Sequence, residues 1–430
     1  MAGNKRGQGE PKRGSRGRYS VFNWRSRGER QERIRRECER EIERLKTETD
    51  LRNQELPIEK EKSHFVRALH DYDVISVEAS TGAGKSLDIG VWTLEELGFD
   101  EARVAMTQPR RDAAQGVCIA AAARHDLKFG PDISFSTSEF KGNTRDTGLQ
   151  ISTTGVLINK FRRDPLLLDY DAVIVDEVHE RDLNIDLTLG LLKRANKMRV
   201  EQNEPPIKII LASATLEQST FSGFFDIPKS ARVQAEGKLF PVEETYTDPN
   251  YKFSEHPRTG EQVERPYTSI ATQHVLDILS STDEGDILVF MPGIRAIRDV
   301  QQQVEASLGE VRGVGNVEVL MLHGISKQKE RSYVLQGSKG HGRRVVVSTN
   351  MAETSVTVPG IRYVVDGARK NEKHFNPDTG LEPLTEVPAT KAECTQRRGR
   401  AGRITEGEYR TVLTQEEYDG LEEHPKPEIK

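Results

Sequence analysis

The clearest chemical pattern in the sequence is a glycine-rich segment between an apolar run at 74–77 and a helical stretch that begins near Leu87. Glycines let backbone N–H groups turn toward phosphates, and the N-terminus of the following helix adds partial positive charge. A lysine there reaches the β and γ phosphates, and a serine hydroxyl can bind Mg²⁺. The segment therefore predicts a nucleotide phosphate loop rather than an ordinary turn. It comprises Ser80, Thr81, Gly82, Ala83, Gly84, Lys85 and Ser86.

Two carboxylates follow another apolar run. Asp176 and Glu177 come directly after residues 172–175, which read Ala-Val-Ile-Val. An aspartate at the carboxyl end of a buried strand beside a phosphate loop can hold Mg²⁺, and the adjacent glutamate can take a proton from water. Taken alone, the pair could instead cap the next helix. Together with the phosphate loop, the pair predicts triphosphate hydrolysis, and no His/Cys cluster suggests another metal.

Four arginines with glycines lie close together at 396–403. Such a run is usually a solvated surface or a phosphate patch. Arginines supplied across a domain cleft also stabilise charge on a transferring γ-phosphoryl group. The cluster therefore suggests that hydrolysis depends on the closure of two domains.

The elements that must position these residues follow from the alternation of short apolar runs with stretches of helical length. This alternation predicts an α/β fold with mostly parallel sheets. Strands are expected at 74–77, 103–106, 172–175, 208–212, 286–291, 317–322, 344–348 and 363–365, and helices at 87–97, 113–123, 185–198 and 295–308. A break near Gly237–Pro241 predicts two domains, at 57–238 and 239–430.

Charge is unevenly distributed along the chain. The net charge is −5, yet residues 1–36 hold twelve lysines and arginines against three acids, and the remainder therefore carries −14. We expect residues 1–36 to form a basic disordered arm and residues 37–56 a charged helix. Arginines interleaved with Tyr19, Phe22 and Trp24 suit phosphates and stacked bases. The arm therefore favours nucleic-acid contact, with a solubilising terminus as the alternative.

Composition also bounds the class of protein. The three cysteines lie far apart, which excludes a disulfide framework and a cysteine-rich zinc site. No run approaches 18 apolar residues, so no transmembrane helix is expected. The N-terminal segment lacks the apolar core of a secretory signal. We expect a cytoplasmic location, or a nuclear one if the source is eukaryotic.

Eight motifs in this order resemble the DEAH-box family of RNA helicases, which are built on two tandem RecA-like domains. They lie at 80–86, 107–111, 153–155, 176–179, 213–215, 290–293, 348–361 and 396–403. The resemblance implies ATP, other nucleoside triphosphates and Mg²⁺ as cofactors, and single-stranded RNA as partner, with DNA as an alternative. It also implies a β-hairpin whose turn lies at 376–380.

The resemblance assigns further roles. Glu177 would be the general base, Asp176 would hold Mg²⁺ through water, and Lys85 and Ser86 would bind phosphates and Mg²⁺. Coupling to movement would use His179, Ser213 and Thr215. The γ-phosphate would meet Gln396 and two arginine fingers, Arg400 and Arg403. The nucleic-acid track would comprise Arg110, Arg111, Thr154, Thr349, Asn350 and Thr354.

The sequence departs from the family pattern in several places. Val178 replaces the usual alanine, Thr154 replaces a frequent aspartate, and Leu87-Asp88 replaces the usual Thr-Gln. Asp88 would bring negative charge near the phosphates if it faced them. The winged-helix, ratchet and OB modules of full-length relatives do not follow residue 430, so unwinding by this chain alone is open.

The leading hypothesis is a monomeric, RNA-stimulated NTPase that moves along or unwinds RNA. The alternative is an NTP-gated RNA clamp that needs a partner for unwinding. That partner would be a protein activator or a substitute for the C-terminal modules. A small-molecule kinase would leave the segments at 348–361 and 396–403 unexplained.

Overall fold

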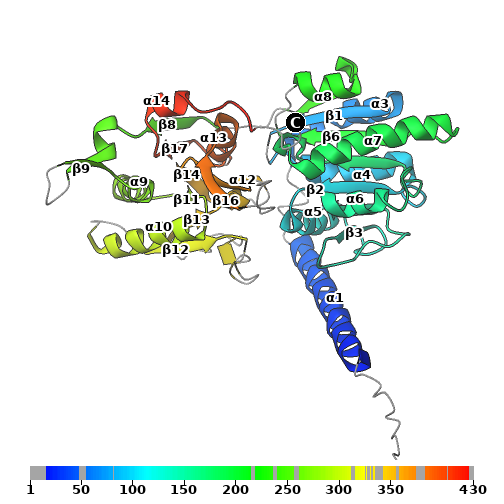
Figure 1. Cartoon of the computed structure of the whole chain (residues 1–430), viewed down its shortest axis with the longest axis horizontal. Coiled ribbons are helices and arrows are strands. Elements are labelled where there is room, and N and C mark those ends of the chain that lie inside the picture. The colour runs from blue at the N-terminus through cyan, green and yellow to red at the C-terminus, as the bar shows by residue number, and fades with distance from the viewer. Residues whose placement is uncertain are drawn as a thin grey trace, which may run out of the picture.

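Two parallel β-sheets, each flanked by helices, make up the body of the molecule (Figure 1). The computed structural model describes residues 16–47, 55–80, 82–214, 218–235, 240–255, 261–310, 315–324, 326, 330, 333–334, 342–354, 358–373, 383–403 and 405–425. The α/β architecture expected from the alternating pattern is confirmed.

The first sheet has seven parallel strands in the order β3-β4-β2-β5-β6-β1-β7. Its strands are β1 (Val74–Ala79), β2 (Val104–Gln108), β3 (Ile133–Ser136), β4 (Leu149–Thr153), β5 (Ala172–Val175), β6 (Lys208–Ser213) and β7 (Arg232–Ala235). The accompanying helices are η1 (Pro57–Glu61), α3 (Lys62–Asp71), α4 (Lys85–Gly98), α5 (Arg111–Arg124), α6 (Thr154–Phe161), η2 (Val178–Glu180), α7 (Leu183–Glu201), α8 (Gln218–Phe225) and η3 (Lys229–Ala231).

The second sheet has six parallel strands in the order β12-β13-β11-β14-β17-β8. Its strands are β8 (Val242–Tyr246), β11 (Asp286–Phe290), β12 (Val317–Leu322), β13 (Arg343–Ser348), β14 (Ile361–Asp366) and β17 (Gly407–Thr411). Its helices are η4 (Pro249–Lys252), α9 (Tyr267–Ser281), α10 (Ile294–Ser307), η5 (Leu308–Glu310), α12 (Met351–Thr354), α13 (Lys391–Arg398) and α14 (Gln415–Asp419).

Two antiparallel pairs complete the fold. One pairs β9 (Phe253–Glu255) with β10 (Gln262–Glu264), and the other pairs β15 (Arg369–Lys373) with β16 (Leu384–Pro388). The second pair is the hairpin expected between the last two motifs. Its turn at 376–380 lies outside the described residues.

Continuous burial explains why the strands read as uninterrupted apolar runs. All four residues of β5 are buried, and so are all five of β11, because helices cover both faces of each sheet. The eight expected strands and four expected helices are all present, with bounds shifted by a few residues. The sequence missed the shorter or more polar strands β3, β4, β7, β8, β9, β10 and β17. The chain passes from the first sheet to the second between Ala235 and Val242.

Helix α1 (Arg16–Thr47) differs from the sequence-based expectation. Residues 16–36 are helical, so a disordered arm is wrong for them, and residues 1–15 lie outside the described part. Ion pairs one turn apart stabilise the helix, as between Arg36 and Glu32 at 2.9 Å and between Arg35 and Glu39 at 3.0 Å. The described helix runs to Thr47, and residues 48–54 of the charged helix expected at 37–56 lie outside the described residues.

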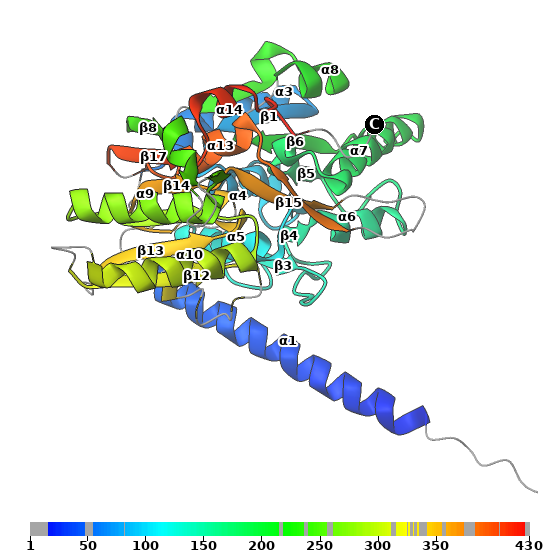
Figure 2. The ribbon, with the colours of Figure 1, turned by 60° about the vertical axis from the view of Figure 1, so that its left-hand side comes forward.

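Figures 1 and 2 show α1 projecting from the body of the molecule, with its C-terminal part against the first domain. Among the residues that the structure describes, no helix has both the length and the apolar character needed to cross a membrane.

Candidate active site between the two sheets

The phosphate loop connects the carboxyl end of β1 to the first residue of α4. Gly82 and Gly84 have φ values of +90° and +91°, a left-handed conformation that glycine adopts without strain. A Cβ on Gly84 would lie 2.4 Å from Leu56 Cδ1, so the loop is packed tightly against the segment that precedes it. The Ile58 N–H also donates to the Ala83 carbonyl at 3.1 Å. Thr81 lies outside the described residues.

Lys85 and Asp176 form a buried ion pair at the centre of the site. Lys85 Nζ lies 2.9 Å from Asp176 Oδ1 and 3.6 Å from Glu177 Oε2. Burial opposes the charge of Lys85, but attraction to both carboxylates outweighs it and raises the lysine pKa. Burial likewise opposes ionisation of Asp176, but Lys85 and the hydrogen bonds at this carboxylate keep its pKa lowered. Both groups are therefore charged at neutral pH.

Two further side chains converge on Asp176 Oδ2. The Ser86 hydroxyl donates to it at 2.5 Å and Gln108 Nε2 donates at 2.7 Å. The parallel sheet explains the convergence, because the carboxyl ends of β1, β2 and β5 meet at one edge. Sequence reasoning did not assign a role to Gln108, although it lies within the motif at 107–111.

Glu177 has a φ of +56°, an uncommon conformation for a residue other than glycine. Its N–H donates to Asp176 Oδ1 at 2.9 Å, which fixes the turn that ends β5. The carboxylate is buried beside Lys85 and His179. Strain of this kind persists where the surrounding contacts over-determine the backbone, as they do here.

His179 lies between Glu177 and the end of β6. Its Nδ1 is 3.0 Å from Ser213 Oγ and 3.5 Å from Glu177 Oε2, and it accepts from the Ala214 N–H at 3.4 Å. Burial lowers the pKa of His179, so the ring is neutral at pH 7. The structure thus brings together two of the three coupling residues. Thr215 lies outside the described residues.

Two arginines of the second domain lie near the residues of the first, and one of them contacts the phosphate loop. A Cβ on Gly82 would lie 3.7 Å from Arg403 Cζ. Burial lowers the pKa of Arg403 to about 10, against attraction from Glu177. Burial and then repulsion from Arg403 lower the pKa of Arg400 well below its usual range. Both arginines therefore lie within electrostatic reach of Glu177, while Gln396 is half-buried on α13.

Arg397, between these residues, has a different role that the sequence did not reveal. It is fully buried, with Nε 3.0 Å from Glu353 Oε2 and Nη1 2.8 Å from Asp366 Oδ1. The Tyr409 hydroxyl donates to the other oxygen of Asp366 at 2.9 Å. Arg397 thereby ties α13 to α12 and β14 and holds the arginines that follow it.

Only some of the residues expected along the nucleic-acid track lie close to one another. Arg110 Nη1 donates to the Asn350 carbonyl at 2.8 Å, which joins the two domains. Thr349 is half-buried beside Asn350, and the side chain of Thr354, at the end of α12, is outside the described part. Thr154 is buried at the start of α6. Arg111 instead contacts Glu139, at 2.6 Å.

Asp88 does not face the phosphate loop. Its buried carboxylate accepts hydrogen bonds from Arg124 Nε at 2.9 Å and from His125 Nε2 at 2.8 Å. Arg124 also pairs with Glu59 beside the loop. This group of charges ties α4 to the end of α5.

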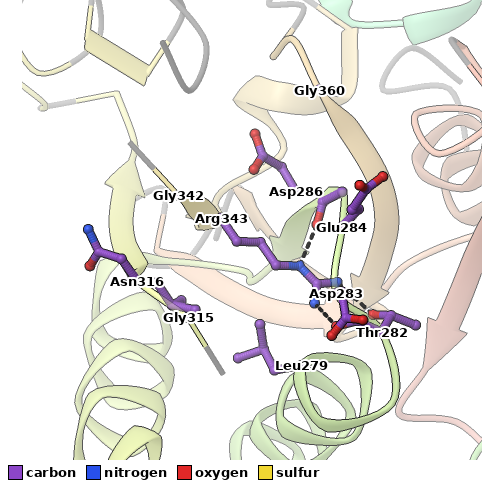
Figure 3. A pocket seen from close by; sticks show the side chains of 12 residues that line it. Leu279, Thr282, Asp283, Glu284, Asp286, Gly315, Asn316, Gly342, Arg343 and Gly360 are labelled. Atoms are coloured by element: carbon purple, nitrogen blue, oxygen red, sulfur yellow. Dashed lines mark hydrogen bonds between the residues drawn. The ribbon is translucent and has the colours of Figure 1, made fainter. Parts of the chain in front are cut away.

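A cavity of about 460 Å³ lies at the opposite edge of the second sheet, where β11, β12 and β13 begin (Figure 3). Arg343 crosses it and donates to the carbonyls of Thr282 and Gly285, each at 2.6 Å. Ligands of open parallel sheets bind at the carboxyl ends of the strands, so this cavity is separate from the candidate site. The described residues hold no cluster of three or more His, Cys, Asp or Glu suited to a metal.

Two parallel-sheet domains that face each other across a phosphate loop and two arginines define a helicase core. Residues 60–222 match the DEAD/DEAH box helicase family, and residues 271–405 match the helicase conserved C-terminal domain. The chain therefore belongs to the DEAH-box helicases, as its motifs suggested.

Individual relatives agree with this assignment. The chain is 32% identical to the ATP-dependent RNA helicase HrpA of Escherichia coli over 87% of its length, which covers 27% of that protein. It is 30% identical to the "Probable ATP-dependent RNA helicase DHX35 homolog" of Caenorhabditis elegans, again over 87% of the chain, covering 50% of that protein. The crystal structure of the Escherichia coli DEAH/RHA helicase HrpB superimposes with a TM-score of 0.75 and 30% identity, over 87% of this chain and 45% of that one. The chain thus spans between about a quarter and a half of these relatives.

Proposed function

We propose that this chain is an ATP-dependent RNA helicase motor. It hydrolyses ATP, and other nucleoside triphosphates, in the cleft between its two domains. It couples hydrolysis to movement along single-stranded RNA or to the unwinding of RNA duplexes. The single observation that carries the proposal is that Arg400 and Arg403 of one domain lie within electrostatic reach of Glu177 of the other, which pairs with Lys85 beside Asp176.

The proposed roles follow from chemistry. The loop N–H groups and Lys85 bind the triphosphate, and Glu177 accepts a proton from the attacking water. Ser86 Oγ and Asp176 Oδ2, 2.5 Å apart, are oxygen donors of the type that Mg²⁺ prefers. Arg400 and Arg403 stabilise the charge of the transferring phosphoryl group, with Gln396 nearby on α13.

The proposed domains are residues 57–238 and 239–430. RNA would run past Arg110, Thr349 and Asn350, with contacts mainly to phosphates and sugars, so sequence specificity is expected to be low. Three buried, unpaired cysteines suit a reducing compartment such as the cytoplasm or nucleus. The proposal also includes a protein partner that activates this chain or substitutes for the C-terminal modules.

Steady-state ATP hydrolysis, with and without single-stranded RNA, tests the proposal. We expect RNA to stimulate hydrolysis, and Glu177→Gln to lower kcat by about 10²- to 10⁴-fold, because the general base is lost. Binding of a fluorescent ATP analogue should persist in the variant. Full hydrolysis by Glu177→Gln would contradict the assignment of the base.

A second candidate is an RNA clamp that closes on its strand without separating duplexes. The contact between Arg110 and the Asn350 carbonyl favours it, because it joins the two domains beside the track. Unwinding of a tailed duplex by the purified chain distinguishes the candidates. ATP-dependent strand separation supports the motor. ATP-dependent changes in RNA affinity without separation support the clamp.

A further inference from the structure

Helix α1 packs against α5, the helix that begins with Arg111. Cys38 and Ile42 are buried in this contact, and Gln115 Nε2 lies 3.6 Å from Cys38 Sγ. Lys46 pairs with Asp126, just beyond the end of α5, at 2.9 Å. The residue numbers at these contacts increase together along α1 and α5, so the two helices are parallel. The N-terminal half of α1 therefore extends past the start of α5, at Arg111.

Gln31 fixes α1 against a second segment near Arg111. Its Nε2 donates to the Glu139 carbonyl at 2.6 Å, and its Oε1 accepts from the Lys141 N–H at 2.9 Å. The segment is itself rigid, because Thr137 Oγ1 accepts from the N–H groups of Glu139 and Phe140, both at 3.2 Å. The Phe140 ring packs at 4.7 Å from that of Phe135. The position of Glu139 is therefore built into the fold.

Glu139 connects two arginines from distant parts of the chain. Arg30 Nη2 lies 2.5 Å from Glu139 Oε2, and Arg111 Nη1 lies 2.6 Å from Glu139 Oε1. Side-chain exposures are 51% for Arg30, 58% for Arg111 and 47% for Glu139. Exposed ion pairs contribute little to stability, so the carboxylate is easily displaced. Two guanidinium groups that converge on one anion also suit a phosphate.

We propose that Arg30 and Arg111 together bind one backbone phosphate of single-stranded RNA, and that Glu139 occupies this position when RNA is absent. The nucleic-acid track then continues from the cleft onto α1. This inference rests on the proposed function and extends its binding surface to a helix outside both sheets.

The course of α1 supports this continuation. Residues 16–29 of the helix hold Arg16, Arg18, Arg25 and Arg27 against the single acid Glu29. Figures 1 and 2 show this part of α1 extending beyond the body of the molecule. A strand that leaves the Arg30–Arg111 site along α1 would therefore meet further positive charge, whereas the rest of the chain is acidic on balance.

Three single substitutions test the inference: Arg30→Gln, Glu139→Gln and the control Arg36→Gln. Arg36 is on the same helix, but its side chain is 67% exposed and pairs with Glu32 within α1. Affinity for a fluorescent uridine homopolymer is measured over a range of salt concentrations. Arg30→Gln should make the negative slope of log affinity against log salt shallower by up to about 0.7, the value for one phosphate of a single strand.

Glu139→Gln should tighten binding by about two- to five-fold, because the competing charge is removed. Arg36→Gln should leave the slope unchanged. Protection of Cys38 from a thiol reagent verifies that α1 stays docked in each variant. A wild-type slope in Arg30→Gln, or equal losses in Arg30→Gln and Arg36→Gln, would overturn the inference. Failure of the wild-type chain to bind RNA at all would instead overturn the proposed function.

Discussion

At the scale of single residues, the two loop glycines are constrained for different reasons. Both have φ near +90°, but a Cβ on Gly84 would lie 2.4 Å from Leu56 Cδ1, whereas on Gly82 the nearest atom, Arg403 Cζ, lies at 3.7 Å. Gly84→Ala therefore adds a clash to a backbone strain of about 1–3 kcal/mol. We expect it to weaken ATP binding more than ten-fold (about 1.4 kcal/mol) beyond the effect of Gly82→Ala. Nucleotide titration measures this difference, and equal losses would show that packing against Leu56 is unimportant.

Much at this scale follows from the sequence, because motif residues lie at the carboxyl ends of parallel strands that meet at one edge. Lys85, Ser86 and Asp176 could be placed together in this way. The partners of Arg111 and Arg397 could not. Glu139 and Arg30 lie 109 positions apart and meet only because α1 docks on α5. Arg397 lies within a run of arginines, and only burial distinguishes it from its neighbours.

At the scale of elements, α13 depends on its buried arginine. Replacement of Arg397 by glutamine would leave Glu353 and Asp366 buried without their charged partner. Loss of one member of such a group costs about 3–5 kcal/mol. We expect Arg397→Gln to lower the free energy of unfolding by that amount in urea denaturation. The control Arg398→Gln, which removes a half-exposed pair with Glu244, should cost about 1 kcal/mol or less.

The packing of α9 against β17 makes the second domain sensitive to acid. His274 Nε2 lies 2.9 Å from Thr247 Oγ1, whose hydroxyl donates to the Thr411 carbonyl at 2.8 Å, so Nε2 carries the proton of a neutral ring. Burial and then repulsion from Arg410 lower the His274 pKa to about 4. His274 binds a proton more readily in the unfolded protein than in the folded one, because its pKa is lowered only in the folded protein. The stability due to the neutral ring is therefore complete above pH 6.5 and is lost as the pH falls toward 4.

This linkage predicts that His274→Gln destabilises the protein less at pH 5 than at pH 7. The difference between the two effects should be about 2 kcal/mol, from a folded pKa of about 4 and an unfolded value near 6.5. Urea denaturation of both proteins at both pH values measures it. The same destabilisation at pH 5 and pH 7 would mean that the ring titrates normally in the folded state.

At the scale of elements the sequence was accurate for strands that are uninterrupted apolar runs. It missed buried strands that contain polar residues, such as β3 and β4, and it was wrong for residues 16–36 of α1. Uninterrupted apolar runs identify strands covered on both faces, such as β5 and β11. The N-terminal half of α1 is rich in arginine and glycine, which also typifies disordered chains. The anchoring of the helix at Gln31, Cys38 and Ile42 depends on surfaces of the first domain that no local pattern encodes.

At the scale of the whole molecule, the hydrogen bond from Arg110 to the Asn350 carbonyl holds the two domains together. Loss of this bond in Arg110→Ala should shift the equilibrium between the closed and open arrangements of the two domains toward the open one by about two- to ten-fold, the effect of one hydrogen bond. Energy transfer between dyes at Asp100→Cys and Gln302→Cys reports the opening, because both sites are exposed and the three native cysteines are buried.

Arg111→Ala is the control for this experiment, since Arg111 contacts Glu139 within the first domain. It should leave the transfer efficiency unchanged. Addition of nucleotide should restore the closed state of Arg110→Ala. Identical efficiencies in the two variants would show that Arg110 does not hold the domains together.

The strand order of the first sheet also determines when β1 can form its strand pairs while the chain is being synthesised. β1, which leads into the phosphate loop, pairs only with β6 and β7, and β6 begins at Lys208. A growing chain must therefore wait for the whole segment between Ala79 and Lys208, which takes roughly ten seconds at ribosomal speed. Ile75 and Val77 have no strand partner during that interval. The nascent protein thus acquires its nucleotide pocket late, and β1 is the segment that a chaperone would need to shield.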